Sequence, residues 1–150
     1  MVGLTGASRA THNRAMLRKN AKLELLRHVP LFERLSKREL EAVAALADEV
    51  QLPEGRKLTQ EGATGTEFVV IVEGAADVRR HGHKINSLGS GDFLGEIALV
   101  TGAPRTATVT TTAPTSVLVI TARGFRSLLR TNPSVQLKVL ETLAARLPDE

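Results

Sequence analysis

The middle of the chain, residues 50–122, is a series of short apolar or alternating runs that Gly, Asp, Asn or Pro interrupts. The interruptions come about every ten positions, a spacing typical of short antiparallel strands joined by turns. Thr, Val and Ile dominate residues 106–121, and β-branched residues favour strands. This pattern predicts an antiparallel sandwich, barrel or jelly roll.

Helical patterns flank this region on both sides. Residues 13–28 predict a helix, and residues 36–50 predict another that begins at Ser36 and Glu39, an S-x-x-E capping box. Residues 121–132 predict a short amphipathic helix, and Asn132 with Pro133 opens a last helix, residues 133–147. Its expected apolar stripe is Val135, Val139, Leu140, Leu143 and Leu147. Helices, then strands, then helices predict an α+β domain.

The composition limits the chemistry that the protein can perform and the cellular compartments in which it is expected. The 150 residues contain no Cys, which excludes disulfides, thiol catalysis and Cys-bound zinc. The start of the chain has no apolar signal region, and no run approaches the roughly 18 apolar residues of a membrane span. We therefore expect a soluble, cytoplasmic protein.

The charge is unevenly distributed along the chain. Residues 1–38 carry nine Lys or Arg and two Glu, a balance of +7, and the remainder carries eleven and fourteen, a balance of −3. A basic arm can attract nucleic acid, acidic lipid or an acidic protein surface. The alternative is a solvated helix, which the absence of Phe, Trp and Tyr from residues 1–31 favours.

Residues 91–109, GDFLGEIALVTGAPRTATV, place two opposite charges among small residues. Gly95 allows a close approach of the backbone, and a helical turn that begins near Glu96 leaves N–H groups at Ile97 and Ala98 free for an anion. Pro104 restricts the backbone ahead of Arg105, whose planar guanidinium suits a phosphate. This combination predicts a phosphate site.

Glu96 needs a different partner, because a carboxylate repels phosphate. A ribose hydroxyl is a donor that a carboxylate accepts well. A phosphodiester folded back on its own sugar presents both groups within a few ångströms. The ligand expected from this pairing is a 3′,5′-cyclic nucleotide.

At these residues the sequence resembles the cyclic nucleotide-binding domain family, of the catabolite activator protein and protein kinase A regulatory subunit type. The family pattern is roughly F-G-E-[LI]-A-L, a short variable stretch, and P-R-[AST]-A-[TS]-V, which appears here as FLGEIALVTGAPRTATV with Leu94 as an additional residue. The resemblance covers about residues 27–147. It implies a jelly-roll-like antiparallel β-roll, or double-stranded β-helix, with flanking N-terminal helices and two C-terminal helices. We expect a basic helical extension at residues 1–26 and the binding domain at residues 27–150.

The resemblance also implies roles for individual residues. Glu96 would accept from the ribose 2′-hydroxyl, and Arg105 would pair with the exocyclic phosphate oxygens. The backbone N–H groups of Ile97, Ala98 and Ala107 would complete the phosphate-binding cassette.

The base would be recognised by two other parts of the chain. Thr106 follows the arginine, where a Thr can bind the guanine of cGMP but is also compatible with cAMP; cAMP is favoured. The last helix would act as a lid in which Arg146 stacks on the base, with Leu143 and Leu147 as apolar cover. Arg146 could equally face solvent.

The charged residues and the histidines also allow other interpretations. Glu96 and Arg105 could be an ordinary surface ion pair. His81 and His83 have the H-x-H spacing of a cupin-like metal site, but no Glu follows at the required distance, and Gly82 between them suggests a hairpin tip. No nucleophile motif is present, so neither a metal nor an enzymatic activity is expected. Arg79 and Arg80 are expected at a solvated strand edge.

We therefore expect a stand-alone, bacterial-like regulatory sensor that binds a cyclic nucleotide and signals by moving its C-terminal helices. The alternative is the regulatory part of a longer channel, kinase or transcription factor. No helix-turn-helix follows the last helix, so nucleic acid is not the expected partner. The sequence does not identify the protein effector or the oligomeric state.

Overall fold

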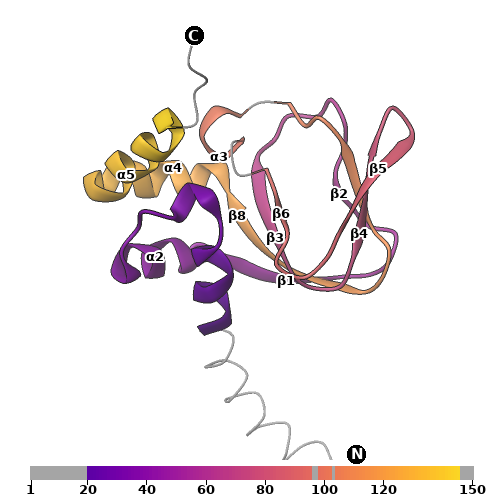
Figure 1. Cartoon of the computed structure of the whole chain (residues 1–150), viewed down its shortest axis with the longest axis horizontal. Helices are drawn as coiled ribbons and strands as arrows, with labels where there is room; N and C mark the ends of the chain where they lie inside the picture. Colours follow the sequence, from indigo (N-terminus) through magenta and orange to yellow (C-terminus); the bar gives the residue numbers. More distant parts are fainter. Residues whose placement is uncertain (1–19, 96–97, 103, 146–150) are drawn as a thin grey trace, which may run out of the picture.

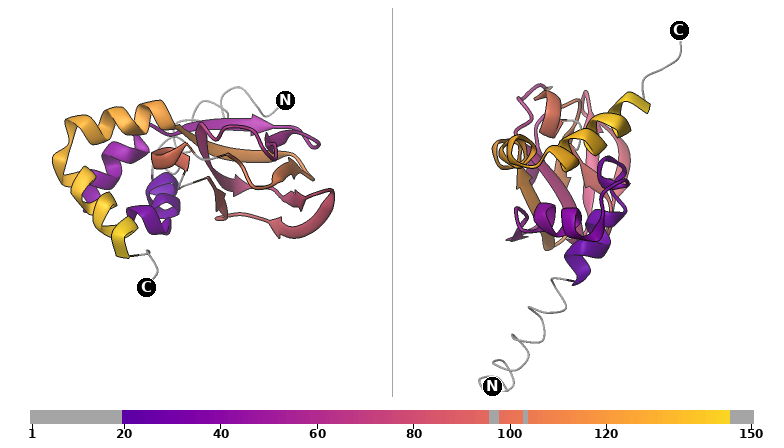
Figure 2. Two further views of the ribbon diagram at one scale, coloured as in Figure 1. Left: turned by 90° about the horizontal axis from the view of Figure 1, so that it is seen from above. Right: turned by 90° about the vertical axis from the view of Figure 1, so that its left-hand side faces the viewer.

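The computed structural model describes residues 20–95, 98–102 and 104–145. Two four-stranded antiparallel sheets form a β-roll, and the helices gather at one end of it (Figures 1 and 2). The expected fold class, an antiparallel β-roll with flanking helices, is confirmed.

The first sheet has the strand order β1-β8-β3-β6 and the second has the order β2-β7-β4-β5. The strands of the first sheet are β1 (Asp48–Leu52), β8 (Thr115–Thr121), β3 (Glu67–Glu73) and β6 (Phe93–Leu94). Those of the second sheet are β2 (Lys57–Thr59), β7 (Thr108–Thr111), β4 (Ala76–Arg80) and β5 (His83–Leu88).

Strands β3 and β8 form the wall between two hydrophobic cores. They pair with each other in the register Val69↔Val119 and Val70↔Leu118, and successive side chains of a strand point to opposite faces. Phe68 and Val70 pack into the helical core, and Val69 packs inside the roll. This double burial explains why both strands are apolar through their centres, at residues 68–72 and 117–120.

The helices lie at the end of the roll where β6 and β8 connect to them (Figure 1). They comprise a helix at residues 20–27, a 3₁₀ turn η1 (Pro30–Phe32), α2 (Lys37–Ala44), α3 (Ala98–Thr101), α4 (Ala122–Thr131) and α5 (Pro133–Ala145). Leu23 and Leu26 of the first helix are buried in the helical core. Residues 1–19, which hold much of the basic arm, lie outside the described residues.

The predicted capping box of α2 is confirmed. The Ser36 hydroxyl accepts from the Glu39 N–H at 3.2 Å, and the Glu39 carboxylate accepts from the Ser36 N–H at 2.8 Å. The predicted extent of this helix, to residue 50, was wrong. The helix ends at Ala44, and β1 begins at Asp48, because this segment pairs with β8.

Three aromatic rings connect the helices to the sheet. Phe32 packs edge-on against Phe68 at a centroid distance of 6.0 Å and against Phe125 of α4 at 5.7 Å. All three side chains are fully buried. Phe32 thus joins the N-terminal turn, strand β3 and helix α4.

The apolar stripe expected on α5 was partly wrong. Val135 and Val139 are buried and Leu143 packs partly against the helical core, but Leu140 is 60% exposed. Thr142 is buried in its place. An advance of 100° per residue turns Leu140 away from the face that Val135 and Val139 share. Leu147 lies outside the described residues.

Across residues 20–95, 98–102 and 104–145, no helix is both long and apolar enough to cross a membrane.

Candidate functional site

The segment expected to hold the ligand crosses from the first sheet to the second. Strand β6 pairs with β3 in the register Val69↔Leu94, and Gly95 follows it. The short helix α3 comes next, and Pro104 then forms an isolated β-bridge with Thr64. The segment thus connects β6 of the first sheet to β7 of the second, and α3 lies between helix α4 and strand β3 (Figure 1).

The backbone of Arg105 is held on both sides. Its N–H donates to the Ala63 carbonyl at 2.7 Å, and its carbonyl accepts from the Gly62 N–H at 2.8 Å. Arg105 precedes β7 by three residues, so it lies in an irregular segment ahead of that strand. These two hydrogen bonds fix the position of the Arg105 backbone, from which its side chain extends.

The guanidinium of Arg105 is half-buried and donates to the backbone carbonyl of Glu67. Burial lowers the pKa of Arg105, whereas the negative charge of Glu67 raises it. Arginine remains protonated in proteins even when it is partly buried. The site thus presents one cation in a defined position.

Gly95 lies directly against this cation. Its φ is +83°, in the left-handed region that favours glycine, and an added Cβ would stand 2.8 Å from Arg105 Cζ and 2.9 Å from the Glu67 carbonyl oxygen. The structure thereby brings two of the predicted site residues together. A glycine is required here by both backbone conformation and space.

The two residues after Arg105 are held by contacts that the sequence did not indicate. The carbonyl of Thr106 accepts from Arg80 Nε at 3.0 Å, and the carbonyl of Ala107 accepts from the Thr59 hydroxyl at 2.9 Å. The Thr106 side chain is exposed. Arg80 is exposed as expected, but its expected place at a strand edge was wrong, because β4 is an inner strand between β7 and β5. No sequence signal could have paired Arg80 with Thr106, since these residues are 26 positions apart.

Three predicted site residues lie outside the described residues: Glu96, Ile97 and Arg146. Helix α3 begins at Ala98, in the region where a helical turn was predicted to begin near Glu96. The ion pair between Glu96 and Arg105, the alternative to ligand binding, therefore lies outside the described residues as well.

The two histidines considered as metal ligands lie at a hairpin turn, as Gly82 predicted: His81 is in the turn and His83 begins the next strand. Strand β4 ends at Arg80 and β5 begins at His83. His81 Nδ1 lies 3.1 Å from a Glu61 carboxylate oxygen. Within the part of the chain that the structure describes, no three His, Asp or Glu residues are grouped closely enough to hold a metal ion.

Helix α4 contacts the site through α3. Arg126 Nη2 donates to the carbonyl of Val100 at 3.4 Å. Thr121 caps α4 by accepting from the Gly124 N–H at 3.1 Å, which confirms the predicted start of this helix. The helix that follows the roll is thus bonded to the same segment that carries Gly95 and Arg105.

Comparison with known proteins identifies relatives of this chain. A family model described as "Cyclic nucleotide-binding domain" matches residues 49–132. The chain is 35% identical over 124 residues to a cyclic nucleotide-gated potassium channel of Rhizobium etli, and this match covers 82% of the chain. It is 39% identical over 118 residues to a cAMP-dependent protein kinase regulatory subunit of Mycosarcoma maydis, and this match covers 71% of the chain. The chain spans only 34% and 22% of the lengths of these two relatives.

Solved structures with the same fold include two from different kinds of protein. The N-terminal domain of a transcriptional regulator from Streptomyces coelicolor matches with a TM-score of 0.75 at 28% identity, over 81% of this chain and 91% of that one. The regulatory domain of Toxoplasma gondii protein kinase A, crystallised with cAMP, matches with a TM-score of 0.67 at 26% identity, over 73% of this chain and 44% of that one.

Proposed function

Because this chain belongs to the cyclic nucleotide-binding domain family, we propose that it binds a 3′,5′-cyclic nucleotide, with cAMP preferred to cGMP. The family is regulatory and not catalytic, and we propose a sensor role without enzymatic activity. The observation that carries the proposal is the half-buried guanidinium of Arg105, held beside Gly95 between the two sheets' connecting strands β6 and β7.

The partner of Arg105 supports an anionic ligand. The guanidinium donates to the neutral carbonyl of Glu67, whereas an anionic oxygen in its place would add Coulombic attraction to the hydrogen bond. A singly charged phosphodiester would therefore be a better partner than this carbonyl. The planar guanidinium can offer two parallel N–H groups to the two exocyclic oxygens.

The remaining contacts follow from the positions of the other predicted residues. We assign the ribose 2′-hydroxyl to the Glu96 carboxylate and the phosphate to the N–H groups of Ile97, Ala98 and Ala107. Arg146 is our candidate for stacking on the base.

We propose that the signal leaves the site through the C-terminal helices. The bond from Arg126 of α4 to the Val100 carbonyl links these helices to α3. A ligand that shifts α3 would shift α4 with it, and a ligand changes an equilibrium only through such differential contacts. The receiver would be a separate protein effector, or the remainder of a longer channel, kinase or transcription factor. The absence of cysteine supports a reducing, cytoplasmic setting.

Calorimetric titration with cAMP and cGMP tests the proposal. We expect binding by the wild type and a loss of about 2–5 kcal/mol in Arg105→Ala, the range for truncating one member of a buried charged pair. Arg56→Ala is the matched control, because Arg56 is an exposed arginine in the turn between β1 and β2. Equal affinities of wild type and Arg105→Ala would refute the assigned role of Arg105, and a wild type that binds neither nucleotide would refute the function.

A further inference from the structure

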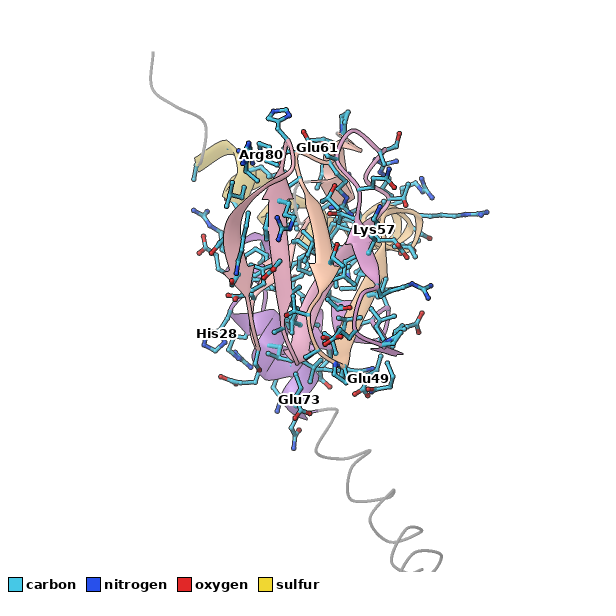
Figure 3. All side chains as sticks on the ribbon, turned by 90° about the vertical axis from the view of Figure 1, so that its right-hand side faces the viewer. His28, Glu49, Lys57, Glu61, Glu73 and Arg80 are labelled. Carbon is cyan, nitrogen blue, oxygen red and sulfur yellow. The ribbon has the colours of Figure 1, made fainter. Side chains whose placement is uncertain are left out.

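The tip of the β4–β5 hairpin, residues 80–82, is bonded to the segment that follows Arg105. Arg80 Nε donates to the Thr106 carbonyl at 3.0 Å. Figure 3 shows Arg80 and Glu61 at the same end of the sheet, close to each other. The hairpin tip therefore belongs to the surroundings of the proposed phosphate site, although it is far from that site in sequence.

A second connection runs through Glu61. Its carboxylate accepts from the His81 N–H at 2.9 Å and lies 3.1 Å from His81 Nδ1. The Glu61 N–H donates to the Thr108 hydroxyl at 3.0 Å. His81 has a φ of 53°, and both its N–H and its ring lie close to the Glu61 carboxylate. The hairpin tip is thus tied to Thr106 directly and to Thr108 through Glu61.

The bond to Thr106 has a consequence for the next residue. The carbonyl of Thr106 and the N–H of Ala107 belong to one peptide unit, which is planar and trans. In such a unit the C=O and the N–H point in opposite directions. A side chain that holds the carbonyl on one side therefore directs the N–H to the other side.

We infer that Arg80 is a positioning residue for the ligand: by holding the Thr106 carbonyl, it directs the Ala107 N–H toward the phosphate. This inference rests on the proposed function, in which the Ala107 N–H is a phosphate donor. Arg80 does not contact the ligand in this account. It acts through the peptide unit between Thr106 and Ala107.

The chain provides a matched control beside Arg80. Arg79 donates to the Gly82 carbonyl at 3.4 Å, within its own hairpin. Both arginines are exposed and lie on the same strand. Replacing Arg79 removes the same charge from the hairpin but leaves the bond to Thr106 in place.

Three variants separate the hydrogen bond from the charge. Arg80→Met keeps an unbranched side chain but has no donor. Arg80→Gln places an N–H donor on Cδ, where arginine carries Nε, and removes the charge. Arg79→Met is the control. We expect cAMP affinity to fall about three- to tenfold in Arg80→Met, as for the loss of one hydrogen bond, and to stay within about twofold of wild type in the other two variants.

Nuclear magnetic resonance provides a readout that is specific to positioning. Addition of cAMP should shift the Ala107 amide proton downfield in the wild type, in Arg79→Met and in Arg80→Gln, and should shift it less in Arg80→Met. In the free protein, the Ala107 amide should exchange with solvent faster in Arg80→Met than in Arg79→Met. Thermal melting of each variant establishes that it is folded.

Each outcome decides for or against the inference. Equal affinity and equal Ala107 shifts in Arg80→Met and Arg79→Met would overturn it, as would an Arg80→Gln variant that is as weak as Arg80→Met. If the wild type binds no cyclic nucleotide, the proposed function fails separately. Hydrogen exchange in the free protein then decides whether Arg80 orients the Ala107 peptide, and equal rates in the two Met variants would show that it does not.

Discussion

The Cα of Gly95 lies against the guanidinium of Arg105, so that a Cβ added to this glycine would stand 2.8 Å from Arg105 Cζ. Gly55 has nearly the same backbone, with φ of +85° against +83° for Gly95. Its Cβ position has nothing within 4 Å among the described residues. The two glycines therefore impose a similar backbone cost on alanine but differ in the space around them.

We expect Gly95→Ala to destabilise the protein more than Gly55→Ala does. Both variants bear the left-handed backbone cost of about 1–2 kcal/mol. Gly95→Ala adds an overpacking cost of about 1–3 kcal/mol and displaces Arg105, so its cAMP affinity should fall at least about tenfold. Chemical denaturation and calorimetry measure both effects. Equal stability and equal affinity of the two variants would show that Arg105 tolerates the extra methyl group.

The hydroxyl of Thr106 is expected to discriminate between the two nucleotides. Its side chain is exposed, and it can donate or accept a hydrogen bond from a base. Thr106→Ala should weaken cGMP binding by about 0.5–1.5 kcal/mol and cAMP binding by less. Calorimetry on this variant and on Thr112→Ala, an exposed threonine in the turn between β7 and β8, provides the comparison. An equal loss for both nucleotides would make Thr106 a phosphate ligand instead.

Glu39 should make the stability of the protein sensitive to acid. Hydrogen bonds from Lys138, from Ser134 and from the Ser36 N–H lower the pKa of Glu39 from 4.5 to about 2. Lys138 Nζ lies 2.5 Å from the carboxylate, so Glu39 caps α2 and also holds α5. Between pH 4.5 and 2 the unfolded state binds more protons than the folded state, so this stabilisation is present above pH 4.5 and is lost as the pH falls toward 2.

The variant Glu39→Gln tests this prediction. It should lower the free energy of unfolding by about 1–2 kcal/mol at neutral pH, and the difference from wild type should shrink as the pH falls through the same interval. Denaturation series at several pH values measure the difference. A difference that stays constant down to pH 2 would mean that the charge of Glu39 contributes nothing.

Phe32 should be among the most costly side chains to truncate. It is fully buried and contacts both Phe68 and Phe125. Phe32→Ala should cost about 3–5 kcal/mol, because it leaves a cavity between the helices and the sheet. Ile85→Ala, at a side chain that is 50% exposed, should stay within about 0.5 kcal/mol. Circular dichroism suits these measurements because the chain has no Trp or Tyr. Similar losses in both variants would contradict the central position of Phe32.

The features that could be predicted are those set by neighbours in sequence. The capping box of Ser36 and Glu39 needs residues only three positions apart, and the hairpin turn at Gly82 needs a few residues that tolerate its backbone. The β-branched run that became β8 predicts a strand wherever it is placed. The phosphate motif around Gly95 and Arg105 is equally local, which is why a family resemblance could be read from it.

The pairings between distant residues could not be predicted. Glu39 reaches Lys138, 99 positions away, and nothing in the capping box indicates a second partner. The exposure of Leu140 depends on which face of α5 packs against the core. Helical spacing alone does not define that face to better than one residue on either side.

The sequence by itself determined the kinds of elements, their order and the residue types at the proposed phosphate site, because short-range backbone preferences and motif spacing act within a few positions. Only the tertiary structure decided that β3 and β8 separate two cores, that Gly95 meets Arg105, and that Arg80 holds Thr106. These contacts depend on strand order and register, which follow from how the whole chain buries its apolar side chains at once.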